Sequence, residues 1–257
     1  MSIGRIWAIA ANGFREAIRD RLLYLVGFFT ILLGMAWRLL PEISAGTHEK
    51  IFLDFGLGAM AVFSVGVAIF VGTGLINKEI EQRTILVLIP KPMSRTEFIV
   101  GKHLGLVAVL AVLLSVMSGV YLALLQMSNT AYPLGSIIVA VVYLLLETIL
   151  LSAVAVVLGV FTSSILATLL SFGIFLMGHV SRDLVELGEL SQNRTVERFT
   201  EALYLILPDL SRLNLRNEAV YGLLPSTLEL FSHALYGVLY TILLLAVAVV
   251  IFSRQEF

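Results

Sequence analysis

The sequence predicts an all-α integral membrane protein with six transmembrane helices. Hydrophobic residues make up 59% of the 257 residues and charged residues only 14%, whereas soluble domains carry roughly 25% charge. Several apolar runs exceed the ~18 residues that mark a membrane-spanning helix. Backbone groups in hydrocarbon must be hydrogen-bonded within their own segment, so runs of this length are helices rather than barrel strands of ~9–11 residues.

Residues 1–21 precede the first apolar run and read as an amphipathic helix. Its apolar residues recur at helical spacing, with Arg5, Arg15 and Arg19 on the opposite side. An arginine-bearing helix with Trp and Phe on its apolar face is typical of the inner membrane interface. We expect an interfacial helix here, and a cytosolic extension of the first span is the alternative. The apolar positions are Ile3, Ile6, Trp7, Ala10, Phe14, Ala17 and Ile18.

Residues 22–257 form the membrane domain. The fifth apolar run has about 17 residues, close to the lower limit for a span, so a broken helix is the alternative there. Lys and Arg decide orientation, and an N-terminus inside the cell places ten of them in cytosolic pieces and seven outside. Both termini are therefore expected in the cytosol. The six spans cover about 22–40, 55–76, 104–127, 135–161, 164–180 and 229–252.

A polar insert at 77–103 separates the second span from the third. Pro90 and Pro92 end one short helix, because proline lacks the backbone donor and restricts the residue before it. Ser94 and Glu97 then have the spacing of a capping box, so the next helix begins directly after Ser94. We expect a cytosolic docking helix here, and a solvated connecting loop is the alternative. The helix has a short apolar stripe that must be buried against the spans or a partner, formed by Ile85, Leu86, Leu88 and Ile89.

The other sizeable polar region is an extracytoplasmic loop at 181–228. A loop of this length is usually functional or folded in its own right. Its leucine spacing predicts two surface helices, the second interrupted at Pro208. The leucines are Leu184, Leu187 and Leu190 in the first helix, and Leu203, Leu207 and Leu210 in the second.

Glu147 lies near the middle of the fourth span. A charge there costs roughly 2.5–3.5 kcal/mol on insertion scales, so a carboxyl group at this depth is a candidate for the translocation path or a proton relay. The alternative is a protonated glutamic acid hydrogen-bonded to a neighbouring helix. No basic residue lies mid-span to pair with it, which favours the neutral form.

Catalytic and metal motifs are missing from the sequence. No phosphate-binding loop occurs, since Gly101-Lys102 lacks both the upstream glycine and the following hydroxyl residue. The chain has no cysteine, and its four histidines do not have metal-ligand spacing. We therefore expect no enzyme activity, no metal and no cofactor in this chain. If it uses ATP, another chain binds it.

Three pieces of the insert resemble the loop between the second and third spans of type-2 ABC transporter permeases. That family's pattern is roughly E-x-E-x-G-T…P-x-S/T-R…G-K, and Arg83 stands where glycine is common. Other segments resemble the subgroup associated with copper-enzyme maturation, typified by the nitrous-oxide-reductase accessory permease. The insert pieces are Glu79-x-Glu81-x-x-Thr84, Pro92-x-Ser94-Arg95 and Gly101-Lys102; the others are Leu158-Gly159…Ser163-Ser164, Gly178-His179 and Leu207-Pro208-Asp209-Leu210-Ser211-Arg212.

The resemblance implies a bacterial inner-membrane permease that pairs with a second copy. Each copy docks one cytosolic ATPase subunit, which binds ATP and Mg²⁺, and the pair acts as an exporter. The loop at 181–228 would form an exit lid or receive an extracytoplasmic protein, and no nucleic acid is involved. The copper association does not extend to the substrate, since no ligand cluster is present. By resemblance, the ATPase-coupling residues are Glu79, Glu81, Thr84, Pro92, Arg95 and Lys102.

Two other classes of function remain open from the sequence. An ATP-independent secondary transporter or channel would use Glu147 as its intramembrane ion or proton site. A membrane scaffold would instead recruit proteins mainly through the loop at 181–228.

Overall fold

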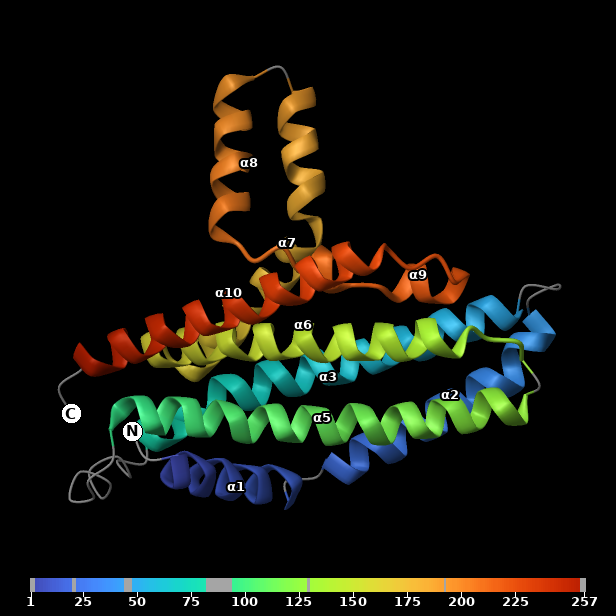
Figure 1. Cartoon of the computed structure of the whole chain (residues 1–257), viewed down its shortest axis with the longest axis horizontal. Coiled ribbons are helices and arrows are strands. Elements are labelled where there is room, and N and C mark those ends of the chain that lie inside the picture. Colours follow the sequence, from blue (N-terminus) through green and yellow to red (C-terminus); the bar gives the residue numbers. More distant parts are fainter. Residues whose placement is uncertain are drawn as a thin grey trace.

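The computed structural model describes residues 3–19, 22–43, 48–81, 94–128, 130–191 and 193–254. The side chains at 16–19, 22, 23, 43 and 78–81 also lie outside this description. Every regular element within the described residues is helical, which confirms the all-α fold (Figure 1).

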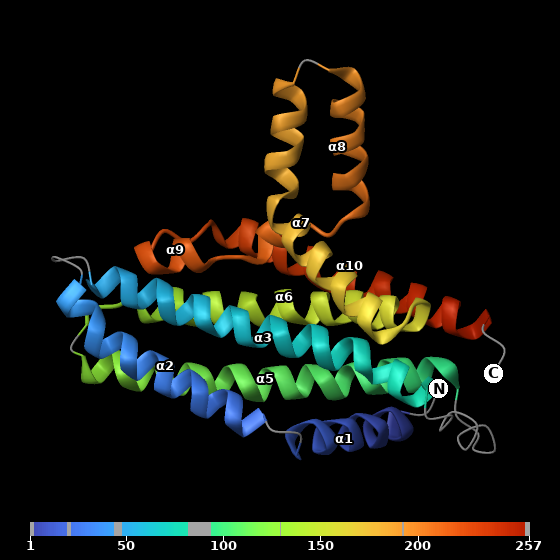
Figure 2. The same cartoon turned by 180° about the vertical axis from the view of Figure 1, so that it is seen from behind.

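Six helices of the described chain are long and apolar enough to cross a membrane, as the sequence predicts. They lie side by side in one bundle, and the short helix α1 runs along its flank (Figures 1 and 2). The six are α2 (Leu22–Ile43), α3 (His48–Glu81), α5 (Arg95–Met127), α6 (Leu134–Phe161), α7 (Ser164–Leu190) and α10 (Thr227–Arg254). The other elements are α1 (Ile3–Arg19), α8 (Arg194–Ile206), the 3-10 helix η1 (Leu210–Leu213) and α9 (Arg216–Tyr221).

Several helix ends gather at one end of the bundle, which we call the terminal end. The start of α1, the end of α3, the start of α5 and the end of α10 all lie there (Figures 1 and 2). The elements that flank the predicted insert are therefore close to both ends of the described chain.

Close packing of α3 against α5 and α6 depends on small residues. The ring of Tyr121 covers Gly56, and its hydroxyl donates to the carbonyl oxygen of Leu53 at 2.8 Å. A Cβ atom on Gly159 would lie 2.9 Å from the carbonyl oxygen of Thr73. Small residues let helix backbones approach closely where apolar lipid gives no hydrophobic driving force between helices.

A helical hairpin stands out from the side of the bundle (Figures 1 and 2). It consists of the second part of α7 and the whole of α8. Helix α8 packs antiparallel to α7, with Thr200 against Gly188. The predicted fifth span, 164–180, is only the first part of α7, and the first predicted surface helix is its continuation to Leu190. The second predicted surface helix ends at Ile206, before Pro208.

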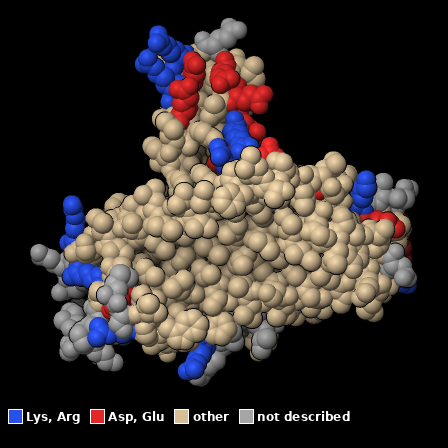
Figure 3. Space-filling view, in the orientation of Figure 1, with Lys and Arg blue, Asp and Glu red and all other residues tan. Residues whose placement is uncertain are grey.

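Charged side chains gather at the ends of the bundle and on the hairpin, while the wide face between the two ends is almost without them (Figure 3). An uncharged band of this kind suits contact with lipid, and the charged hairpin requires water or protein around it. The eight charged residues of the hairpin are Arg182, Asp183, Glu186, Glu189, Arg194, Glu197, Arg198 and Glu201.

Candidate coupling site and buried polar clusters

The residues predicted to couple the chain to an ATPase are spread along the insert at 77–103, from the end of α3 to the start of α5. Glu79 and Glu81 belong to the last turn of α3, and their side chains are not described. Thr84 and Pro92, together with the predicted double-proline turn and apolar stripe, lie outside the described residues. Arg95 and Lys102 lie in the first turns of α5, so the structure places two of the six predicted residues near each other.

The capping box at the start of α5 is confirmed. The backbone N–H of Glu97 donates to Ser94 Oγ at 3.1 Å, and the backbone N–H of Ser94 donates to Glu97 Oε2 at 3.1 Å. The pair satisfies two donors that the helix itself leaves without partners. Glu97 is only 2% exposed, and its Oε2 lies 3.9 Å from Nη1 of Arg5 on α1. The first turn of α5 is thereby fixed in position and connected to α1.

Arg95 reaches from the first turn of α5 to the last turn of α10. Its Nη1 donates to the carbonyl oxygens of Phe252 at 2.8 Å and of Ser253 at 2.6 Å. Below this contact the rings of Phe98 and Phe252 stack, with centroids 5.9 Å apart and planes inclined by 16°. A residue that the resemblance assigns to the ATPase interface thus makes its described hydrogen bonds within the chain.

Lys102 is buried, and its Nζ lies 5.9 Å from the centre of the Phe98 ring. The glycine before it has a clearer role in packing. A Cβ atom on Gly101 would lie 2.8 Å from the Cβ of Ile9, and one on Gly105 would lie 2.8 Å from the carbonyl oxygen of Ala10. Glycine spaced four residues apart therefore lets α1 lie directly against the backbone of α5.

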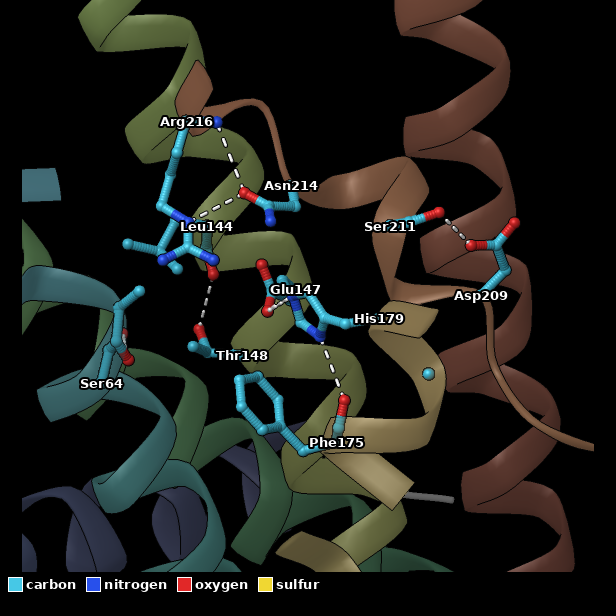
Figure 4. Close-up of polar contacts among 12 residues, drawn as sticks. Ser64, Leu144, Glu147, Thr148, Phe175, His179, Asp209, Ser211, Asn214 and Arg216 are labelled. Atoms are coloured by element: carbon cyan, nitrogen blue, oxygen red, sulfur yellow. Dashed lines mark hydrogen bonds and ion pairs between the residues drawn. The ribbon is translucent and has the colours of Figure 1, made fainter. Parts of the chain in front are cut away.

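Glu147 on α6 faces His179 on α7 (Figure 4). Its Oε1 lies 3.3 Å from His179 Nε2, a distance that suits an ion pair, although the angles are not those of a hydrogen bond. The expectation that no basic side chain lies beside Glu147 is therefore wrong. His179 was missed because it stands near the end of the predicted fifth span, and the sequence does not show that this level of α7 lies beside the middle of α6.

The second ring nitrogen of His179 faces a backbone acceptor of its own helix. His179 Nδ1 lies 3.0 Å from the carbonyl oxygen of Phe175, and a carbonyl only accepts, so Nδ1 carries a proton. Nε2 is then the ring nitrogen that faces the carboxyl group of Glu147, at 3.3 Å and without hydrogen-bond geometry. This contact between α6 and α7 is buried, since Glu147 is 2% exposed.

A second polar cluster surrounds Asp209 at the base of the hairpin. Asp209 Oδ2 accepts from Arg182 Nε at 2.8 Å and from Arg212 Nε at 2.9 Å. Its Oδ1 accepts from Ser211 Oγ at 2.5 Å, as Figure 4 shows. Its backbone N–H donates to Tyr236 Oη at 2.8 Å. Asp209 therefore connects three elements: its buried carboxylate joins α7 to η1, and its backbone N–H contacts α10.

The electrostatics of this cluster favour the charged carboxylate. Burial raises the pKa of Asp209, but the hydrogen bonds from Ser211, Arg212 and Arg182 outweigh burial and hold the pKa below its ordinary value. The hydrogen bond to Asp209 in turn raises the pKa of Arg212. Arg212 also donates through Nη2 to Tyr204 Oη at 3.0 Å, which extends the cluster to α8.

Sequence reasoning missed Asp209 and its partners as a site. The run from Leu207 to Arg212 supported only the resemblance to a permease subgroup. Its useful signal is the series Asp209, Ser211 and Arg212, which places two hydrogen-bond donors within three residues of one acid. Nothing local marks Arg182, which comes from 27 residues away.

A comparison with known protein families matches residues 7–257 to the family described as ABC-2 family transporter protein. A search of curated proteins finds no match. The family match covers nearly the whole chain and agrees with the six candidate spans. This chain therefore belongs to the ABC-2 transporter family.

Proposed function

We propose that this chain is the membrane-spanning permease subunit of an ATP-driven exporter. It pairs with a second copy of itself and is coupled to a separate cytosolic ATPase through the insert at 77–103. The observation that carries the proposal is the position of the insert. The last part of the insert is the first turns of α5, where Glu97 contacts α1 and Arg95 contacts α10.

This arrangement supports a mechanical role for the insert. A push from the ATPase on the insert reaches α5 at its capped first turn. The salt bridge to α1 and the hydrogen bonds to α10 then spread the displacement to two further helices. Packed interfaces of this kind shift between discrete arrangements rather than deform continuously, so a small displacement can open or close a path.

The remaining assignments belong to the same proposal, and family membership and charge support them. The ATPase supplies ATP and Mg²⁺ binding, since this sequence carries no phosphate-binding loop. The terminal end faces the cytosol of a bacterial cell across its inner membrane, and the segment 181–228, which includes the charged hairpin, is assigned to the extracytoplasmic side. There it serves as an exit lid or as a docking surface for an extracytoplasmic protein.

Reversing the charges of Glu79 and Glu81 to lysine is expected to release the ATPase while the chain stays in the membrane. The two acids lie at the end of α3, in the first part of the insert, and are proposed to position it by ion pairs with the ATPase. Loss of such pairs should lower the amount of ATPase bound by about tenfold or more, since about 1.4 kcal/mol corresponds to a factor of ten. Gentle purification from native membranes followed by mass spectrometry measures the ratio of a phosphate-loop protein to this chain.

Glu49→Lys is the matched control, because it reverses an exposed acid in the first turn of the same helix at the opposite end. This variant should retain the ATPase in the wild-type ratio. Coupling through the insert is refuted if the Glu79 and Glu81 variants keep both the ATPase and ATP-dependent transport.

A secondary transporter that uses Glu147 is the competing function, and the contact with His179 favours it over an ordinary packing role. Glu147→Gln keeps the shape of the side chain but removes the exchangeable proton. Under the ABC proposal this variant should transport nearly as well as the wild type. If instead purified chain in proteoliposomes conducts protons without ATP, as a pH-sensitive dye would report, and Glu147→Gln abolishes that flux, the secondary-transporter function replaces the proposal.

A further inference from the structure

Arg95 occupies a position that is unfavourable for its own helix. It is the first residue of α5, where the partial positive charge of the helix dipole disfavours a cation. Acidic residues are preferred in that turn, and Glu97 satisfies the preference. The capping role at the start of α5 is filled by Ser94 and Glu97, so the stability of α5 does not explain an arginine here.

The same guanidinium is well placed for α10. The last carbonyl groups of a helix have no partner within it, and a cation near them is favoured by the helix dipole. Nη1 of Arg95 donates to two of these carbonyl groups, those of Phe252 and Ser253, at 2.8 and 2.6 Å. Its Cζ also lies 5.9 Å from the centre of the Phe252 ring. The side chain thus caps a helix that is 157 residues away in sequence.

The contact continues into a packed joint below it. Phe98 and Phe252 stack, and both belong to one buried cluster with Ile76 of α3 and Val156 of α6. Four helices are therefore in contact directly beneath the hydrogen bonds from Arg95 to α10. If the start of α5 moved while the end of α10 stayed in place, the two charge-assisted hydrogen bonds from Arg95 would break.

From this geometry we propose that Arg95 is a positioning residue that clasps the C-terminal end of α10 to the first turn of α5. The inference rests on the proposed function, because it states how a displacement of the insert is passed on: α5 and α10 move as one body. Arg95 then contributes to transport by transmitting the displacement to α10. Its described contacts do not require it to bind the ATPase.

The chain has no cysteine, so spin labels can be attached at two introduced cysteines alone. Leu104→Cys on α5 and Val250→Cys on α10 are both exposed positions. Electron–electron resonance on the full chain in lipid nanodiscs then gives the distance distribution between the two helices. With Arg95 intact we expect one narrow distribution, and with Arg95→Gln a broader one shifted to longer distances.

Arg254→Gln is the matched control, since it removes an exposed arginine of the last turn of α10 and should leave the distribution unchanged. Arg95→Lys keeps the charge but loses the planar fork, so an intermediate width is expected. If Arg95→Gln does not fold, the width of the distance distribution in Arg95→Lys tests the clasp by itself. The clasp is disproved if both Arg95 variants give the wild-type distribution.

The ATPase provides a separate readout. Arg95→Gln should still copurify with the phosphate-loop ATPase in the wild-type ratio, but ATP should no longer change the label distance. If Arg95→Gln loses the ATPase instead, Arg95 is a docking residue and the inference fails while the proposed function stands. If the wild-type chain never carries an ATPase, the proposed function fails, and the label distances still test the clasp.

Discussion

Asp209→Asn is expected to detach the base of the hairpin from the bundle. The neutral side chain cannot sustain the charge-assisted hydrogen bonds from Arg182 and Arg212, which join α7 to η1. Hydrogen bonds to charged groups contribute about 1.5–3 kcal/mol each, and the half-exposed Arg182 places the total loss near the lower end, roughly 2 kcal/mol. Hydrogen exchange over 182–206 and trypsin cleavage after the exposed Arg194 and Arg198 should both accelerate.

Asp183→Asn is the control for this change, because Asp183 is an exposed acid on α7, next to Arg182. Substitutions of that kind usually alter stability by less than about 0.5 kcal/mol. Equal protection of the hairpin in the two variants would show that the Asp209 cluster does not hold it.

The same cluster predicts a pH dependence with a definite sign. The folded state lowers the pKa of Asp209 from its ordinary value of 3.8. The folded state therefore binds this proton less readily than the unfolded state, and the stabilisation is complete above the unfolded pKa. It is lost as the pH falls through the folded pKa. The wild-type hairpin should approach the protection of Asp209→Asn in acid and differ from it at neutral pH.

Gly105→Leu is expected to displace α1 from α5. Even a Cβ atom at this position would lie 2.8 Å from the backbone carbonyl oxygen of Ala10, and a backbone atom cannot rotate away as a side chain can. Overpacking of this kind costs about 1–3 kcal/mol, and α1 can escape it by leaving its site. Spin labels at Asn12→Cys on α1 and Leu104→Cys on α5 would report a longer and broader distance.

Gly119→Leu provides the comparison on the same helix, because a Cβ atom there meets nothing within 4 Å. It should leave the distance between α1 and α5 unchanged. An unchanged distance in Gly105→Leu would mean that close backbone packing at Gly105 does not hold α1 against α5.

Much of the local structure could be predicted from the sequence. The apolar runs give the six spans, because the length of a helix that crosses hydrocarbon is set by the bilayer. The capping box gives the start of α5, since Ser94 and Glu97 act on each other within one turn. Helix bounds were less accurate, and α7 continues ten residues beyond the predicted end at 180 because its polar second half packs on α8.

The chemistry of the candidate sites depended on contacts between distant segments. The sequence gives Glu147 as a buried acid but not its partner, because His179 is brought beside it only by the packing of α6 against α7. The motif marks Arg95 but not its target, the carbonyl groups at the end of α10. Asp209 lies in a motif run, yet its partners come from α7, η1 and α10.

The sequence by itself thus determined the class of protein, the number of spans and the place of the insert, because these depend on composition and on spacing within one helix. The tertiary structure alone decided which side chain faces Glu147, which helix end Arg95 caps and how the hairpin is held. Each of these depends on the relative placement of two or more helices. Many helix arrangements satisfy the same apolar pattern in a membrane, and side-chain packing and hydrogen bonds select among them.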